Sequence, residues 1–369
     1  MVVEPDVGEA SDRRVDDGGG GGDDGFGGGE IGHGSRGYAA ISERSQRCGR
    51  HGAAGTVGAV IDPAGPALDA LLSWGDVVRR DLPWRRTRDP FAILVAEVML
   101  QQTQVDRVIP RWLRFLERWA TPASLAAAGL SDVLVEWSGL GYPRRARNLH
   151  LAAGEVVERF AGSLPRDLDA LLSLPGVGAY TARAVQVFAF EVDTGVVDTN
   201  IARVLARVTG RRLTAREAQA LADAAVPPGR SWEHNQTLMD LGATVCRRRP
   251  TCEACPIAEW CSWRRDAGES ADPAIGSAGA SGRQARFEGS DRQLRGRLMA
   301  ALAVGDVALD DVGRVVALPD DPQRCARVVA SLVRDGLVAV VDDGAGGAGR
   351  AGSAAMVRLG GTRPVPAVP

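Results

Sequence analysis

Apolar residues recur at helical spacing through the middle of the chain. The clearest case follows Asp89 and Pro90, where the sequence continues FAILVAEVMLQQTQV. An N-cap carboxylate with proline in the first turn is a typical helix start. Further helices are expected at 66–80, 106–119, 122–128, 131–137, 143–160, 167–173, 179–190, 198–208, 214–224 and 232–246. No convincing strand pattern interrupts them, so residues 66–266 are predicted to form an all-α core.

Residues 285–369 have a different pattern. Asp291–Val304 and Gln323–Gly336 are predicted to be helices, and 337–343 and 354–359 to be short strands around a glycine-rich tip. Helices followed by a two-stranded wing suggest a small winged-helix-like domain. An unrelated α+β tail is the alternative at this point.

Two segments have compositions that do not support a core. Residues 1–65 include GGGGGDDGFGGG and carry 6 Arg against 11 acidic residues, which predicts a disordered tail. Residues 267–284 are small and polar, which is typical of a linker. The core between them carries 26 Arg against 23 acidic residues, a mild basic excess that is weak support for nucleic-acid binding.

The composition excludes several kinds of chemistry. All 44 basic residues are arginine, so no lysine can form a Schiff base or act as a general base. No run of 18 apolar residues predicts a membrane span, and the acidic N-terminus does not resemble a signal peptide. A cytoplasmic location is therefore expected. In that reducing compartment, six cysteines suggest metal ligands before disulfides.

Four of the cysteines lie within sixteen residues, spaced C-x5-C-x2-C-x5-C: Cys246, Cys252, Cys255 and Cys261. Zinc sites with four cysteines usually use two C-x2-C pairs, and only one pair is present here. A single compact loop is more typical of a [4Fe–4S] cluster, so the spacing favours iron–sulfur over zinc.

The segment LPGVGAYTARAV (174–185) predicts a tight turn between two helices. Gly176 and Gly178 on either side of Val177 permit close backbone approach, and the turn directs amide N–H groups outward at a helix start. Such a helix-hairpin-helix can hold a DNA backbone without reading its sequence.

Two carboxylates stand in apolar surroundings. Glu97 is the only charge in FAILVAEVML, and burial would raise its pKa toward neutrality, as a general acid requires. Asp198 in GVVDTNIARV also fits a helix N-cap, where the dipole and N–H groups would keep it ionised. An ionised aspartate beside a protonatable glutamate suits cleavage of a glycosidic bond.

The segments LPWRRTRDPF, EVMLQQTQV, GLGYPRRARNLH, LPGVGAYTA, VVDTNIARVLAR, HNQTLMDLGATVC and CEACP resemble the adenine DNA glycosylase (MutY) family of the endonuclease III/helix-hairpin-helix superfamily. The resemblance covers about half of the chain. It implies two α-helical lobes, a [4Fe–4S] cluster, and removal of adenine mispaired with 8-oxoguanine or guanine in double-stranded DNA. A monomer is expected.

The resemblance also implies roles for particular residues. Glu97 falls on the acid that protonates adenine N7, and Asp198 on the aspartate that stabilises the oxocarbenium-like state. Tyr180 and Asn200 fall on positions that assist in the pocket. Gln102 and Tyr142 fall on residues that insert into the duplex where the base has left.

Tyr180 separates branches of the superfamily. The lyase branch has a catalytic lysine at this position, so tyrosine here implies a glycosylase that forms no enzyme imine. A thymine/uracil mismatch glycosylase is the alternative enzyme, although EVMLQQTQV favours the adenine branch. A non-catalytic iron–sulfur DNA-binding protein is the alternative of another class.

The chain departs from the family pattern in three places. The first cysteine gap has five residues where six is usual, and Pro143 stands where a second tyrosine is common. Residues 285–369 do not resemble the Nudix-like domain with which many members read 8-oxoguanine.

Overall fold

The computed structural model describes residues 62–266, 271–279, 286–342 and 355–361. Most of the expected disordered tail (1–65) and the glycine-rich tip of the C-terminal domain lie outside these residues. Every expected helix of the core is present, and residues 66–266 contain no strand. The all-α prediction for the core is therefore confirmed.

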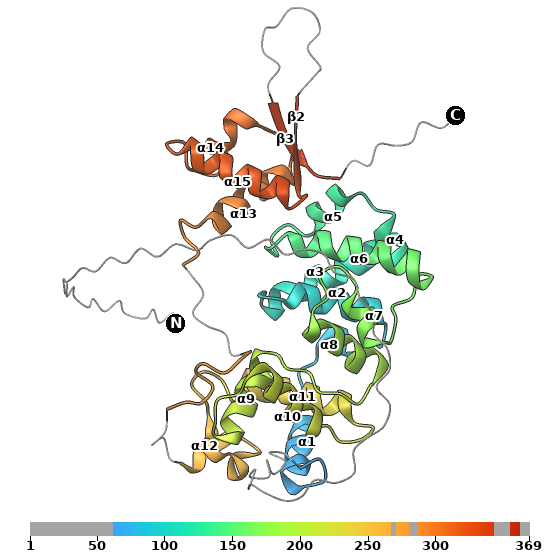
Figure 1. The fold of residues 1–369 in the computed structure, drawn as a ribbon, viewed down its shortest axis with the longest axis vertical. Helices are drawn as coiled ribbons and strands as arrows, with labels where there is room; N and C mark the ends of the chain where they lie inside the picture. The colour runs from blue at the N-terminus through green and yellow to red at the C-terminus, as the bar shows by residue number, and fades with distance from the viewer. Residues whose placement is uncertain (1–61, 267–270, 280–285, 343–354, 362–369) are drawn as a thin grey trace, which may run out of the picture. The chain divides into compact units, whose positions relative to one another are not determined.

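One group of core helices surrounds α2, and its members occupy neighbouring positions in Figure 1. The group consists of α2 (Pro90–Leu100), α3 (Val105–Arg118), α4 (Pro122–Ala126), α5 (Leu130–Glu136), α6 (Arg144–Phe160), α7 (Leu168–Leu172) and α8 (Ala179–Phe190). Asp89 caps α2 by accepting a 2.9 Å hydrogen bond from the amide of Phe91, as expected from the sequence. All residues of α2 from Phe91 to Met99 are buried, so α2 is the central helix of the group.

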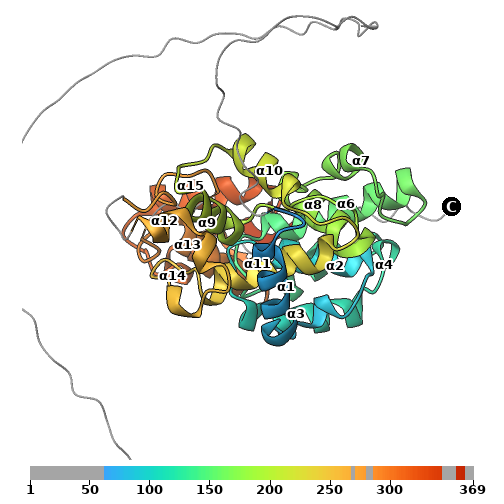
Figure 2. The same cartoon turned by 90° about the horizontal axis from the view of Figure 1, so that it is seen from below.

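The second group combines the first helix of the core with its last four. It consists of α1 (Pro66–Val78), α9 (Thr199–Thr209), α10 (Ala215–Ala224), α11 (Ser231–Thr244) and α12 (Ser262–Arg265). Figure 2 shows α1 beside α11, and the two helices pack against each other. Gly75 on α1 makes this packing possible, because an added Cβ would lie 2.2 Å from the Thr237 hydroxyl oxygen on α11.

A buried ion pair fixes the segment that enters α2. Arg85, in the short 3₁₀ helix η1 (Pro83–Arg85), donates hydrogen bonds of 2.7 and 2.9 Å to the two carboxylate oxygens of Asp240 on α11. Arg80 donates a third hydrogen bond, of 2.6 Å, to the same carboxylate. The two parallel hydrogen bonds fix the orientation of the Arg85 guanidinium as well as neutralising its charge. Helix α11 therefore orients the chain segment that precedes α2.

Residues 271–279 lie within the expected linker, yet they pack on α9. Asp272 accepts hydrogen bonds from Arg207, and the amide of Ala278 donates to the carbonyl of Leu213. Ala274 and Ser277 are buried. The small side chains of residues 271–279 allow this close packing on α9. Because small polar residues are also typical of linkers, the composition alone did not predict the packing.

The C-terminal domain alternates helices with strands. Its elements are α13 (Asp291–Leu302), β1 (Val307–Ala308), the 3₁₀ turn η4 (Leu309–Asp311), α14 (Val312–Val315), α15 (Pro322–Arg334), β2 (Val338–Asp342) and β3 (Ala355–Leu359). The three antiparallel strands are ordered β1-β3-β2, with Val307 opposite Val357 and Val338 opposite Leu359. This order of elements is that of a winged helix. The two expected strands are present, but β1 and α14 were not predicted because they span only two and four residues.

Among the described helices, none has the length and apolar character needed to cross a membrane.

Candidate functional site

The carboxyl group of Glu97 lies inside the helix group around α2. It is the one charge in that helix and is only 6% exposed. Burial raises its pKa to about 7, and the negative charge of Asp198 acts in the same direction. The hydrogen bond from Tyr180 and the charge of Arg85 act against this shift. Near neutral pH, Glu97 is therefore about half protonated and can both give and take a proton.

Tyr180 reaches Glu97 from the first turn of α8. Its hydroxyl donates a hydrogen bond of 2.8 Å to Glu97 Oε2. Burial and the nearby carboxylates hold the pKa of Tyr180 well above its usual value, so the phenol stays a neutral donor. The close packing of α2 against α8 makes this contact possible between residues that are distant in sequence.

Asp198 is the N-cap of α9. Its Oδ1 accepts hydrogen bonds of 2.9 and 2.7 Å from the amides of Asn200 and Ile201, and its Oδ2 accepts one of 2.8 Å from Asn200 Nδ2. These bonds and the charge of Arg203 favour the carboxylate, but burial outweighs them and raises its pKa above the ordinary value. The expectation that Asp198 caps a helix was right. The expectation that the helix dipole and the N–H groups decide its ionisation was not, because burial sets the direction of the pKa shift of Asp198.

Arg203, which sequence reasoning missed, connects Asn200 with the start of the cysteine loop. It donates hydrogen bonds of 2.8 Å to Asn200 Oδ1, 2.7 Å to the carbonyl of Gly242, and 2.7 Å to the carbonyl of Cys246. Gly242 leaves space for this arrangement, because an added Cβ would lie 2.6 Å from Asn200 Cβ. The only sequence signal is the spacing of Arg203 three residues after Asn200 on the same helix.

The predicted hairpin turn lies directly before α8. Gly176 has φ +77°, and an added Cβ would lie 2.7 Å from Asn148 Cβ on α6. Val177 is buried and anchors the turn, while Gly178 is the exposed N-cap of α8 and has no side chain to cap it. The amides at this helix start therefore face a position where an anion can bind.

Gln102 and Tyr142 lie on two different loops with strained backbones. Their φ angles are +57° and +49°, in the left-handed region that side chains other than glycine rarely adopt. Gln102 is exposed and Tyr142 half-buried. Such strain is common in residues that serve a ligand rather than the fold.

Arg145 ties these two loops together. Its guanidinium donates hydrogen bonds to backbone carbonyls at both sites. The acceptors are Val98 (2.7 Å), Met99 (3.0 Å), Gln101 (2.6 Å), Leu140 (3.0 Å) and Gly141 (2.9 Å). One half-buried cation therefore satisfies the C-terminal carbonyls of α2 and the carbonyls before Tyr142. Sequence reasoning missed this residue too.

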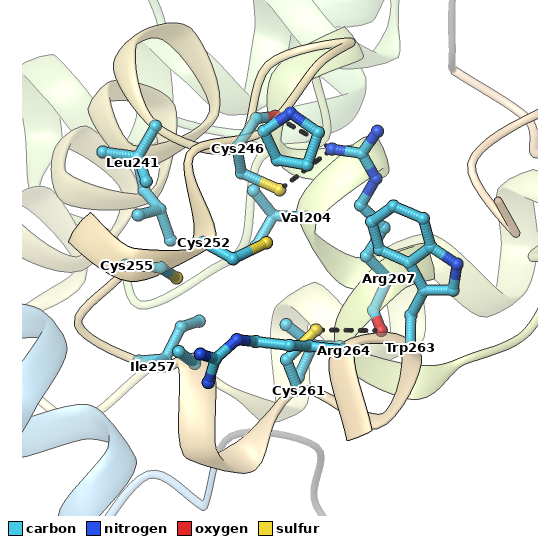
Figure 3. A pocket seen from close by; sticks show the side chains of 14 residues that line it. Val204, Arg207, Leu241, Cys246, Cys252, Cys255, Ile257, Cys261, Trp263 and Arg264 are labelled. Atoms are coloured by element: carbon cyan, nitrogen blue, oxygen red, sulfur yellow. Dashed lines mark hydrogen bonds between the residues drawn. The ribbon is translucent and has the colours of Figure 1, made fainter. Parts of the chain in front are cut away.

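The four cysteines line a single pocket. Figure 3 shows their sulfur atoms directed toward a common space beside Arg207 and Arg264. Arg207 is 1% exposed, and its Nη1 lies 3.4 Å from Cys246 Sγ, while the Cys261 thiol lies 3.3 Å from the Arg207 carbonyl oxygen. A buried arginine that contacts both ends of the loop fixes the distance between those ends.

The thiols surround the pocket without closing on one point. In the part of the chain that the structure describes, no three His, Cys, Asp or Glu side chains are grouped as ligands of one metal ion. Burial raises the pKa of Cys255 to about 11 and also raises that of Cys252 and Cys261. These three thiols would therefore need a cationic group beside them to stay deprotonated.

The predicted site residues thus form separate groups. Glu97, Tyr180, Asp198 and Asn200 share one site between α2, α8 and α9, in which Glu97 is buried and the other three are half-buried. Gln102 and Tyr142 are linked through Arg145 and the carbonyls it binds. The remaining groups are the hairpin turn of Gly176, Val177 and Gly178 and the pocket of Cys246, Cys252, Cys255 and Cys261.

Comparison with known proteins is consistent with this geometry. The model of the HhH-GPD superfamily of base excision DNA repair proteins matches residues 95–228. Adenine DNA glycosylase of Mycolicibacterium smegmatis is 43% identical over 280 residues, which cover 74% of this chain and 93% of that protein. The human adenine DNA glycosylase is 44% identical over 212 residues, covering 53% of this chain and 39% of the human protein.

Among solved structures, a thermostable thymine-DNA glycosylase is similar, with a TM-score of 0.51 and 31% sequence identity. The match covers 54% of this chain and 95% of that chain. The helical core therefore has the fold of the superfamily. This match covers about half of the chain, whereas adenine DNA glycosylases of Mycolicibacterium smegmatis and Mycobacterium tuberculosis each align with 74% of it.

Proposed function

Because the chain belongs to the adenine DNA glycosylase family of the HhH-GPD superfamily, it is a base excision repair enzyme acting on N-glycosyl bonds in DNA, and we propose that it removes adenine mispaired with 8-oxoguanine or guanine. The observation that carries the proposal is the pairing of Glu97, whose pKa is about 7, with the carboxyl group of Asp198. Glu97 is the acid, and Asp198 is the charge that stabilises the sugar.

In the proposed mechanism, the adenine leaves the helix stack and enters the site between α2 and α8. The protonated Glu97 gives its proton to adenine N7, so the electron pair of the C1′–N9 bond can leave with a neutral base. Tyr180 holds Glu97 Oε2 by its 2.8 Å hydrogen bond and orients the carboxyl group for this transfer. Because the acid is buried in an apolar helix, its proton is available near neutral pH.

As the base leaves, positive charge develops on the deoxyribose. Asp198 in its ionised form stabilises this oxocarbenium-like centre. Water then adds at C1′ and gives one proton to the Glu97 carboxylate, which the first step left deprotonated. Asn200 keeps the carboxylate oriented through its backbone amide and its side-chain amide. Arg203 in turn holds Asn200, so we assign it as a positioning residue.

The reaction ends with release of the base. Tyr180 stands where the lyase branch has lysine, and the chain contains no lysine. We therefore propose that the enzyme leaves an abasic site and forms no side-chain imine with it. Borohydride treatment should trap no covalent complex through a side chain.

The duplex is held by backbone groups and by inserted side chains. The turn at Gly176, Val177 and Gly178 directs the amides of the α8 N-terminus at a phosphate, which fixes position without reading sequence. Gln102 and Tyr142 enter the duplex where the base has left and offset the cost of unstacking it. We propose that one protein monomer binds one duplex, which light scattering of the complex would test.

The four-cysteine pocket fits an iron–sulfur cluster. Cys246, Cys252, Cys255 and Cys261 would hold a [4Fe–4S] cluster through their thiolates, and all four sulfur atoms are directed into the same pocket. When bound, the cluster supplies cross-links that fix the loop 246–261 against α9. The purified protein should be brown, absorb broadly in the visible range, and contain iron and sulfide. A colourless protein with zinc would overturn this assignment.

The decisive experiment is an excision assay on duplexes of one sequence with different mismatches. We expect alkali-sensitive breaks at adenine opposite 8-oxoguanine and opposite guanine. Duplexes with thymine or uracil opposite guanine test the rival activity suggested by the thymine-DNA glycosylase relative. The absence of breaks at adenine would overturn the proposal. Glu97→Gln should lose excision by about 100-fold or more while folding and DNA binding remain.

A further inference from the structure

The C-terminal domain contains an exposed helix face that the proposed catalytic site does not use. Helix α15 buries Cys325, Val328, Val329 and Leu332 against its own domain. The opposite side of the helix is exposed and continuous over three turns. It consists of Gln323, Ala326, Arg327, Ala330, Val333 and Arg334.

This face suits a polyanion. It contains two arginines and no carboxylate, and the two alanines at its centre allow close approach to the helix. Six ion pairs involve the described residues of this domain: Arg144–Asp335, Arg286–Glu288, Arg295–Asp335, Arg314–Asp311, Arg324–Asp291 and Arg358–Asp306. Neither Arg327 nor Arg334 takes part in an ion pair among the described residues, so both guanidinium groups are available to an external partner.

The position of α15 in the domain points to a duplex. Helices α14 and α15 follow one another across the short segment 316–321, and α15 leads directly into strand β2. In helix-turn-helix domains, the second helix of such a pair lies in the major groove, which is wide enough to admit an α-helix. The acidic residues Asp320 and Asp321 lie at the N-terminus of α15, so phosphate contacts would come from Arg327 and Arg334 further along.

The face also adjoins the residues proposed to enter DNA. Asp335, the residue after Arg334, places its Oδ1 3.6 Å from Arg144 Nε. Arg144 is two residues beyond Tyr142 in the chain. On α13, Arg292 donates a hydrogen bond of 3.1 Å to the Tyr142 hydroxyl. A duplex that receives Tyr142 would therefore extend close to the C-terminal end of α15.

We propose that the exposed face of α15 is a second binding surface for double-stranded DNA, and that Arg327 and Arg334 contact phosphates of the duplex beside the lesion. These contacts contribute affinity whichever base the enzyme removes. The inference therefore depends on DNA binding and not on the choice of adenine.

The test is DNA binding by the full chain, measured without any chemistry. The probe is a duplex with a tetrahydrofuran abasic analogue opposite guanine, followed by fluorescence anisotropy at several salt concentrations. We expect Arg327→Glu and Arg334→Glu each to weaken binding several-fold. The slope of log Kd against log salt concentration should fall by about one for each arginine lost.

Arg216→Glu is the matched control, because Arg216 is also an exposed helical arginine and its substitution changes the net charge equally. Wild-type affinity and slope in the α15 variants, or a change no larger than that of Arg216→Glu, would overturn the proposal. Arg327→Gln, which adds no negative charge, should retain the melting temperature and still lower the slope. Because no base is excised, the result is independent of whether adenine is the substrate.

Discussion

The Tyr180 hydroxyl and the Glu97 carboxyl group form a 2.8 Å hydrogen bond between the first turn of α8 and the interior of α2. This bond favours the charged form of Glu97, whereas burial favours the neutral form. Burial is the larger effect, so the pKa of Glu97 is about 7. The two helices thus set the proton affinity of the residue that we propose as the acid.

Tyr180→Phe should move the pH dependence of excision to higher pH. In the wild type, we expect the single-turnover rate to fall about tenfold per pH unit above pH 7, as Glu97 loses its proton. Removing the tyrosine hydroxyl removes a hydrogen bond that lowers the pKa of Glu97, so the decline should begin later. The measurement is the single-turnover rate from pH 5 to 9. If the rate of Tyr180→Phe declined at the same pH as that of the wild type, the Tyr180–Glu97 hydrogen bond would not have the assigned effect. Glu97→Gln should show no such decline with pH.

Asp198→Asn should separate catalysis from stability. Asparagine caps helices as well as aspartate does, and its side-chain oxygen can accept the same hydrogen bonds from the amides of Asn200 and Ile201. The bond that Asn200 Nδ2 donates to Asp198 Oδ2 is lost, so we expect the free energy of unfolding to fall by about 1 kcal/mol, and the excision rate to fall about 100- to 1,000-fold with the lost charge.

The matched control is Asp89→Asn, because Asp89 caps α2 with the same kind of bond. It should retain the excision rate. Equal rate losses in the two variants would indicate that Asp198 acts only as a cap.

Arg145→Met should destabilise the protein. The pKa of Arg145 is lowered by burial to about 10, so the side chain stays cationic at neutral pH. Its loss would leave carbonyls of both loops without their donor. We expect the free energy of unfolding to fall by about 3 kcal/mol in urea titrations. Arg107→Met is the control, because exposed Arg107 also donates to this region, at the Gly139 carbonyl, and should cost less than about 1 kcal/mol. Equal effects would contradict the bridging role.

His234 should make the protein less stable in mild acid. It is fully buried on α11, and neither ring nitrogen has a hydrogen-bond partner among the described residues. Burial lowers its pKa from 6.5 to about 4. Between these values the unfolded chain binds the proton and the folded chain does not, so the free energy of unfolding falls as pH decreases from 6.5 to 4. The loss approaches about 3 kcal/mol.

In the variant His234→Leu, the free energy of unfolding should change less with pH between 6.5 and 4 than in the wild type. Glu97 has the opposite effect, since its raised pKa makes the folded chain bind more protons between pH 4.5 and 7. Comparing variant with wild type cancels that contribution. His150→Gln, at a half-buried histidine that contacts the Ala128 carbonyl, is the control. An unchanged slope in His234→Leu would contradict the assignment.

Local sequence was sufficient for most helices and for the candidate residues. Asp89 and Pro90 fix the start of α2, because a cap and a fixed φ act within one turn. The four cysteines are close in sequence, so the chain itself brings them near one pocket. Short elements such as β1 lack enough residues to show a pattern, and they form only because partner strands are present.

The absence of lysine and the presence of a lone glutamate in an apolar helix follow from the sequence alone. They restrict the proposed enzyme to base release with a buried acid. Tertiary structure decided the proton affinities and the supporting residues. The direction of the pKa shift of Asp198 depends on how much water the surrounding helices exclude, which its neighbours in the chain do not determine. Arg145 and Arg203 act on carbonyls more than thirty residues away, so only the packing of helices gives them their roles.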